Sequence, residues 1–109
     1  MIDLILVLVT FPSMESARQI GTALVEKQLA ACVNFIPGIE SIYRWQGKIE
    51  FAAEVLAIIK TSTAALEVLE REVRCLHPYE LPEFIVIKPA SAGHDYLAWV
   101  LDNVRSASP

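Results

Sequence analysis

The sequence predicts an α+β fold of the split βαβ type, with a four-stranded antiparallel sheet, two helices on one of its faces and a further helix at the end. Three observations predict it. Runs of branched aliphatic residues near both ends indicate buried strands, two amphipathic segments have helical spacing, and a long hairpin pattern lies between them. The expected order is strand, helix, strand, strand, helix, strand, helix.

The first strand and helix occupy the N-terminal quarter of the chain. Ile2 to Val9 is an almost continuous aliphatic run, which is typical of a central strand buried on both faces or along a subunit contact. Ser13 is the expected N-cap of a helix that continues to about Leu29. On the apolar side of this helix, the small residues Ala17 and Gly21 should allow close approach to the sheet.

The central segment is expected to form a long β-hairpin. Its arms run from Cys32 to Trp45 and from Lys48 to Thr61, with a tight turn at Gln46-Gly47 and a bulge or bend at Pro37-Gly38. Arms of this length exceed ordinary strands, so the hairpin should extend beyond its own domain. A neighbouring subunit would then cover its outer apolar side chains. The residues expected at this interface are Tyr43, Trp45 and Phe51.

The second half of the chain returns to alternating helix and strand. The hydroxyl groups of residues 61–63 are the expected N-cap acceptors of a second helix that ends near Leu76. Glu83 to Lys88 is predicted to be a buried strand, and Asp95 lies at the start of a third helix. Because two helices cover one face of the sheet, its other face should be covered by self-association.

Composition limits the partners of this protein. With 54% hydrophobic and 20% charged residues, residues 1–109 are expected to form one domain with a compact core. The net charge of −4 and the lack of a Lys or Arg run argue against nucleic acid or an anionic membrane as partner. The longest apolar run is too short to span a bilayer and the start lacks signal-peptide features, so a cytoplasmic location is expected.

Most side chains suited to a binding site lie between the second helix and the last strand. In residues 76–83, LHPYELPE, two prolines stiffen the backbone and present His77, Tyr79 and Glu83. The alternative is that the prolines only end a helix and the polar groups face water. Cys75 could add sulfur to the imidazole of His77 in a soft-metal site, although two ligands alone make a poor one.

The sequence contains no recognisable catalytic constellation. It has no nucleophile elbow, no Gly-rich phosphate loop and no zinc-protease helix motif. An acid and base pair of His77 and Glu83 would lack a nucleophile or oxyanion donor, so no enzyme is expected. Glu54 and Lys60 interrupt an apolar strand, either as a structural ion pair or as a ligand clamp. Cys32 is expected to be a small core residue.

Several motifs resemble those of the CutA family, the divalent-cation tolerance proteins. They are VTFP at 9–12, LAACVN at 29–34, IYRWQGKIE at 42–50, IKT at 59–61, HPYELPE at 77–83 and YLAW at 96–99. The likeness covers almost the whole chain. It implies a ferredoxin-like fold assembled as a tight homotrimer, similar to the nitrogen-regulatory signalling trimers.

The resemblance also implies tolerance to divalent metals, especially copper. Some family members are described as binding copper through a cysteine after the first strand and a His-His pair before Pro-Tyr. Here Val9 and Leu76 occupy two of those positions, which leaves His77 and should weaken copper binding. The expected function is therefore a non-enzymatic homotrimer that has no obligatory cofactor and takes copper or another divalent cation, and the alternative is a small-molecule-binding signalling trimer. The residues expected in its intersubunit clefts are His77, Tyr79, Glu83 and Lys60.

Overall fold

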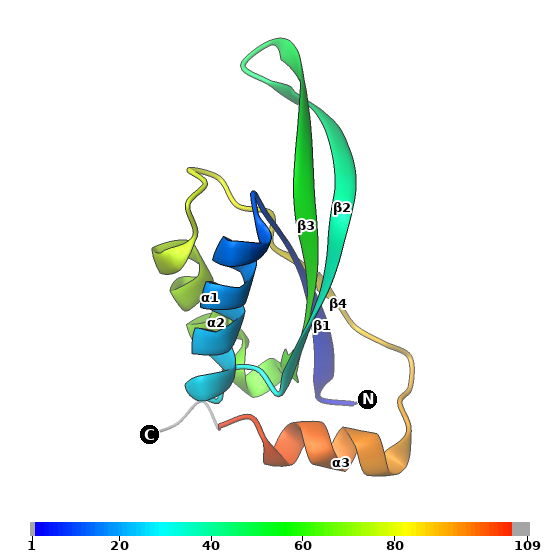
Figure 1. The fold of residues 1–109 in the computed structure, drawn as a ribbon. Coiled ribbons are helices and arrows are strands. Elements are labelled where there is room, and N and C mark those ends of the chain that lie inside the picture. The colour runs from blue at the N-terminus through cyan, green and yellow to red at the C-terminus, as the bar shows by residue number, and fades with distance from the viewer. Residues whose placement is uncertain (1, 106–109) are drawn as a thin grey trace.

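The computed structural model describes residues 2–105, and its elements follow the predicted order (Figure 1). All four strands are antiparallel to their neighbours, in the spatial order β2-β3-β1-β4. The predicted α+β class and four-stranded antiparallel sheet are thus confirmed. The elements are β1 (Leu4–Phe11), α1 (Met14–Glu26), β2 (Cys32–Trp45), β3 (Lys48–Ser62), the 3-10 turn η1 (Thr63–Ala65), α2 (Leu66–Leu76), β4 (Ile85–Ile87) and α3 (His94–Asp102).

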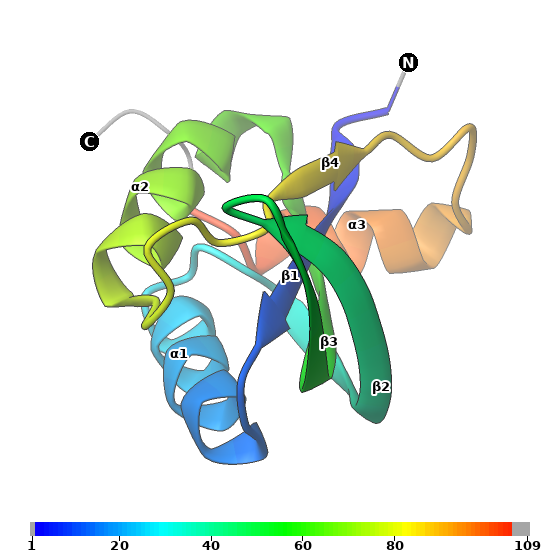
Figure 2. The same ribbon diagram turned by 90° about the horizontal axis from the view of Figure 1, so that it is seen from above.

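The helices cover the sheet unequally. α1 and α2 lie side by side on one face, whereas α3 crosses the end of the sheet at which β1 begins (Figures 1 and 2). The core lies between the sheet and α1 and α2, because alternate side chains of β1 and β3 point toward these helices. None of the described helices has the length and apolar character needed to cross a membrane. The β1 and β3 side chains of this core are Ile5, Val7, Val9, Phe11, Val55, Ala57 and Ile59.

The two predicted N-caps have different outcomes. The Ser13 Oγ accepts a hydrogen bond from the N–H of Ser16 at 3.1 Å, so this cap is confirmed. The cap predicted at residues 61–63 is wrong, since Ser62 makes no capping bond with its side chain. Thr61 instead turns inward, and its Oγ1 donates to the carbonyl of Leu29 at 2.7 Å. The chain therefore enters α2 through the 3-10 turn.

α1 ends at Glu26, earlier than the predicted Leu29. Gln28 adopts a left-handed conformation with φ of 57°, and the N–H of Leu29 reaches back to the carbonyl of Leu24 at 2.9 Å. These are the features of a Schellman motif, in which glycine usually occupies the left-handed position. Because this position holds glutamine, no residue type marked the end of the helix in advance.

The hairpin of β2 and β3 is confirmed. Gln46 and Gly47 form its two-residue loop with φ of 50° and 80°, as a type I′ turn requires. The register shifts between Ile36 and Ile39, at the predicted bulge. The hairpin projects well beyond the sheet, and the described chain extends 44 Å along its longest axis (Figure 1).

β4 is shorter than the predicted buried strand from Glu83 to Lys88, and the predicted burial is wrong because Ile85 and Ile87 are exposed in the single chain. Only Ile85–Ile87 pairs with β1. At the end of β1, the carbonyl of Thr10 accepts a hydrogen bond from the Nε2 of His77 at 2.7 Å rather than from a longer β4. Glu83 consequently lies outside the ladder.

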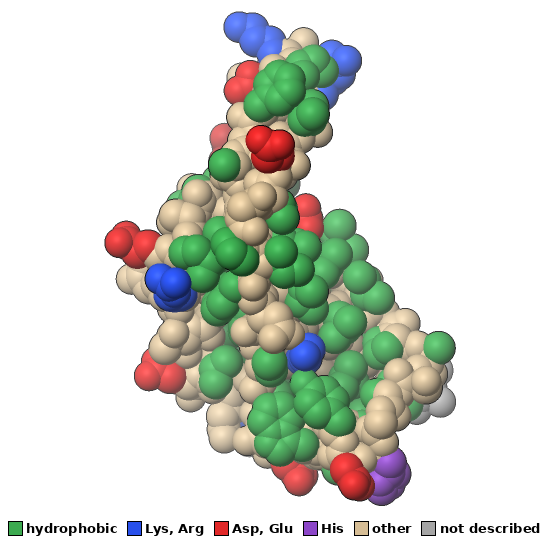
Figure 3. Space-filling view, turned by 45° about the vertical axis from the view of Figure 1, so that its right-hand side comes forward, with side chains coloured by type: hydrophobic (Ala, Val, Ile, Leu, Met, Phe, Trp, Pro, Cys, Tyr) green, Lys and Arg blue, Asp and Glu red, His purple; other side chains and the backbone are tan. Residues whose placement is uncertain are grey.

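The sheet face turned away from α1 and α2 is apolar and partly uncovered. Cross-strand partners share a face, and the register pairs Leu8 with both Ile58 and Ile85. Figure 3 shows hydrophobic side chains gathered on this side of the molecule. We call this surface the open face, and it comprises Leu6, Leu8, Ile36, Leu56, Ile58, Ile85 and Ile87, all at least partly exposed.

Candidate functional site

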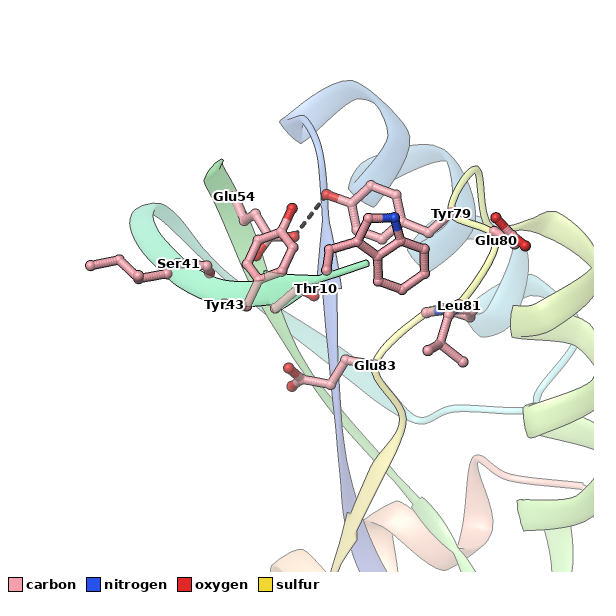
Figure 4. Close-up of a pocket in the computed structure, with 11 residues that line it drawn as sticks. Thr10, Ser41, Tyr43, Glu54, Tyr79, Glu80, Leu81 and Glu83 are labelled. Atoms are coloured by element: carbon pink, nitrogen blue, oxygen red, sulfur yellow. Dashed lines mark hydrogen bonds between the residues drawn. The ribbon is translucent and has the colours of Figure 1, made fainter. Parts of the chain in front are cut away.

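A groove lies at the end of the sheet where β1 finishes, between the hairpin and the loop from α2 to β4 (Figure 4). Its volume is about 730 Å³. Eleven described residues line it, and they come from three segments that are distant in sequence. They are Thr10 of β1, residues 41–43 with Trp45 and Glu54 of the hairpin, and residues 79–83 of the loop.

Strand register brings Thr10 and Glu54 to the same side. Thr10 pairs with Leu56, and Glu54 lies two residues before Leu56 on β3, so both side chains point away from α1 and α2. Only 7% of Thr10 and 9% of Glu54 is exposed. A carboxylate this deeply buried is costly unless it is hydrogen-bonded.

The loop supplies that hydrogen bond. The Tyr79 hydroxyl donates to the Oε2 of Glu54 at 2.7 Å (Figure 4). Burial raises the pKa of Tyr79, and the bond to Glu54 raises it further, so the phenol remains a donor. Among residues 2–105 the other oxygen of Glu54, Oε1, has no hydrogen-bonding partner. Since no fully buried side-chain nitrogen or oxygen there is unpaired, Oε1 keeps some exposed surface, and Glu54 is one of the residues that line the groove.

His77 supports this loop from behind rather than lining the groove. The ring is buried and stacks on Phe11 with 4.8 Å between centroids. Its Nδ1 accepts the N–H of Tyr79 at 3.0 Å, so the proton lies on Nε2, which donates to the Thr10 carbonyl. Burial lowers the pKa of His77, which favours the neutral form of the ring over the imidazolium ion.

This arrangement affects the metal hypothesis for His77 and Cys75. Both ring nitrogens of His77 are engaged, so a metal ion could bind only after one hydrogen bond breaks. Cys75 is exposed on α2. Within the described chain, no three His, Cys, Asp or Glu side chains come close enough together to hold a metal ion. The hypothesis stays a prediction and requires a rearrangement of the loop.

Lys60 lies apart from the groove. Lys60 pairs with Leu6 of β1, and its side chain is on the same face of the sheet as that of Glu54. The two residues are about 20 Å apart along β3. Its Nζ is 5.5 Å from the centroid of the Tyr96 ring. An ion pair between Lys60 and Glu54 is therefore ruled out within one chain. Cys32, which pairs with Lys60 across the strands, is half-buried and lies outside the core cluster where it was expected.

Glu83 does line the groove, on the same side as Glu54 (Figure 4). Burial raises the pKa of Glu83, and the nearby charge of Glu54 raises it further. Two carboxylates that share one space are stabilised by a cation between or beside them. The rings of Tyr43 and Trp45, predicted as interface residues, also form part of the wall.

The sequence pointed to only part of this site. Tyr79 and Glu83 were predicted, and Glu54 carried a signal because a charge within an apolar strand needs a partner. Thr10 and Ser41 carried none, since only strand register and the bulge turn them toward the groove.

Residues 5–103 match the family model described as CutA1 divalent ion tolerance protein. The divalent-cation tolerance protein CutA of Thermus thermophilus is 48% identical over 97 residues, which cover 89% of this chain and 94% of that protein. The human protein CutA is 47% identical over 100 residues. That match covers 92% of this chain and 56% of the human protein, so the chain spans little more than half of it.

Solved structures show the same likeness. The structure of the divalent cation tolerance protein Cut A1 from Thermus thermophilus superposes with a TM-score of 0.91 and 46% sequence identity. The match covers 94% of this chain and 99% of that chain.

Proposed function

Because this chain belongs to the CutA1 divalent ion tolerance family, we propose that it is a non-enzymatic, homotrimeric divalent-cation tolerance protein. The strand order β2-β3-β1-β4 with two helices on one face supports a ferredoxin-like classification. The similar proteins described above carry CutA names, which favours cation tolerance over a nitrogen-regulatory type of signalling trimer. We propose the cytoplasm as its location, from the sequence expectation alone.

One observation carries the cation-binding part of this proposal. Glu54 presents a free carboxylate oxygen from an almost fully buried position, with Glu83 on the same side of the groove. Oxygen donors suit divalent cations such as Mn(II) and Mg(II), whereas Cu(I) prefers thiolate and imidazole. In the proposal, the divalent cation binds between these carboxylates. A copper ion would use His77 only after displacing a hydrogen bond.

The open face and the hairpin support the trimer. Phe51 is 74% exposed and pairs across the hairpin with Ile42, which is 68% exposed. Apolar surface of this extent is usually covered by a partner. In the proposed trimer, neighbouring copies cover both surfaces, and the groove becomes an intersubunit cleft. Lys60 can join such a cleft only from a second copy.

Sedimentation equilibrium tests the assembly. We expect a mass near three times that of the 12.1 kDa chain, and a stable species near 12.1 kDa would contradict the trimer.

Calorimetric titration with Mn(II), Cu(II) and Cu(I) tests the cation site. Glu54→Gln should weaken Mn(II) and Cu(II) binding at least about tenfold. Glu50→Gln, which removes an exposed carboxylate of β3 outside the groove, should leave binding unchanged. If His77→Gln abolishes metal binding while Glu54→Gln does not, the site is at the imidazole and the groove proposal fails.

A further inference from the structure

We propose that the groove also binds small primary alkylammonium ions, with the ammonium group at Glu54 and the alkyl chain along the aromatic wall. This inference rests on the groove being a cation site, as proposed above. It adds an organic class of cation to the divalent metal.

The size of the groove favours an organic ligand. A water molecule occupies about 30 Å³ in the liquid, so a metal ion with a few waters would fill only part of a volume of about 730 Å³. Pockets for small organic molecules typically span about 300–1,000 Å³.

The charge of the wall selects a cation. Of the eleven described residues that line the groove, three are glutamates and none is Lys, Arg or His. Figure 4 shows Glu80 at the far edge, whereas Glu54 and Glu83 share one side. An organic anion would meet like charge here without a compensating cationic side chain among these lining residues.

The buried carboxylate selects an N–H donor. Glu54 already accepts one hydrogen bond from Tyr79, and its free Oε1 can accept a second. Charge-assisted hydrogen bonds from an ammonium group are strong, and they offset the cost of burying the carboxylate. A quaternary ammonium ion lacks N–H groups and cannot make this bond.

The remaining wall suits an alkyl chain and a positive charge. The rings of Tyr43, Trp45 and Tyr79 can make cation–π contacts, and Leu81 and Pro82 add apolar surface. Tyr79 is fixed at both ends, because its N–H donates to His77 and its hydroxyl to Glu54. A ring held in this way loses little entropy when a ligand binds.

Three probes of similar size test the proposal on the full chain in its assembled state. n-Butylammonium carries charge and N–H donors, tetramethylammonium carries charge alone, and 1-butanol carries neither charge nor ammonium. Calorimetry or ligand-observed NMR should show saturable binding of n-butylammonium, at least about fivefold weaker binding of tetramethylammonium and no binding of 1-butanol.

Variants locate the binding. Glu54→Gln keeps an acceptor for Tyr79 but removes the charge, and it should weaken n-butylammonium at least about tenfold. Trp45→Leu, which removes the indole ring from the groove wall but keeps an apolar side chain, should weaken it about two- to fivefold. Glu50→Gln should have no effect.

Three results would overturn the inference: no binding of n-butylammonium, equal binding of all three probes, or unchanged binding in both Glu54→Gln and Trp45→Leu. If Mn(II) binds through Glu54 and n-butylammonium does not bind, this inference fails and the proposed function stands. If n-butylammonium binds and no divalent metal does, the metal part of the proposed function fails instead.

Discussion

On the sheet face that α1 and α2 cover, Val7 and Ile59 have no exposed surface, whereas on the open face Ile85 and Ile87 remain 49% and 41% exposed. Both faces are built from the same types of aliphatic side chain, which alternate between the two faces along β1, β3 and β4. Their difference lies in what covers them. Two helices complete one face, whereas residues 2–105 provide no equivalent layer for the other. The same type of side chain therefore stabilises the fold on one face and favours association on the other.

The groove lies where these two faces end. His77 stacks on Phe11, which belongs to the helix-covered core, and reaches the backbone of β1. Tyr79 connects this side to Glu54, which points to the opposite side of the sheet. A site built across both faces depends on the core behind it and on whatever covers the open face.

Placing a charge on the open face should produce the largest effect. Ile87→Asp would bury a carboxylate in the proposed subunit contact, and we expect the trimer to dissociate into folded chains near 12.1 kDa. Val25→Asp is a matched control, since Val25 is 42% exposed but lies on α1. Sedimentation velocity measures both. A trimer that survives Ile87→Asp, or that dissociates equally with Val25→Asp, contradicts the assignment of the open face to the interface.

Removing His77 should lower the stability of the fold, because this ring connects the loop from α2 to β4 with the end of β1. His77→Ala loses two hydrogen bonds and the stacking on Phe11, and it leaves the Thr10 carbonyl without its donor. We expect the free energy of unfolding to fall by about 2–4 kcal/mol. His94→Ala, at the exposed start of α3, should change it by less than about 0.5 kcal/mol.

Urea unfolding at one fixed protein concentration measures both variants, because stability depends on concentration in an oligomer. Equal effects of the two substitutions would mean that His77 has no special structural role.

Local signals in the sequence were sufficient for the order of elements, the hairpin turn and the bulge. Gly47 and Pro37-Gly38 mark conformations that few other residues adopt, and apolar periodicity marks the helices. The end of α1 was missed because Gln28 occupies a position usually held by glycine. The groove was only partly predictable. Strand register decides that Thr10 and Ser41 face it, and distance along β3 decides that Lys60 lies too far away to reach it. Such relations exist only after the strands have paired.

The helix-covered face should tolerate little added volume. A Cβ at Gly21 would lie 2.8 Å from the Cζ of the Phe35 ring, closer than packed atoms allow. Gly21→Ala gains helix propensity of about 1 kcal/mol but forces the ring to move, so we expect a net loss of about 1–2 kcal/mol. In the double variant with Phe35→Leu, the cost of the alanine should largely disappear. An additive double-mutant cycle would contradict this contact as the cause.

His77, behind the groove, and Glu83, in its wall, should respond oppositely to pH, with the smallest effect of the series. Burial holds the pKa of His77 below 6.5 in the folded chain, so its contribution to stability is complete above about pH 6.5 and is lost as pH falls through the lower folded-state pKa. The pKa of Glu83 is raised above 4.5, so its contribution is complete below about pH 4.5 and is lost as pH rises through the folded-state value. Between these limits the stability contribution of His77 rises with pH while that of Glu83 falls, so the two slopes of unfolding free energy against pH partly cancel. Glu83→Gln removes one of them, and urea midpoints measured from pH 4 to 8 should then rise more steeply with pH than in the wild type. A Glu83→Gln profile parallel to that of the wild type would show that burial in the groove does not control this carboxyl group.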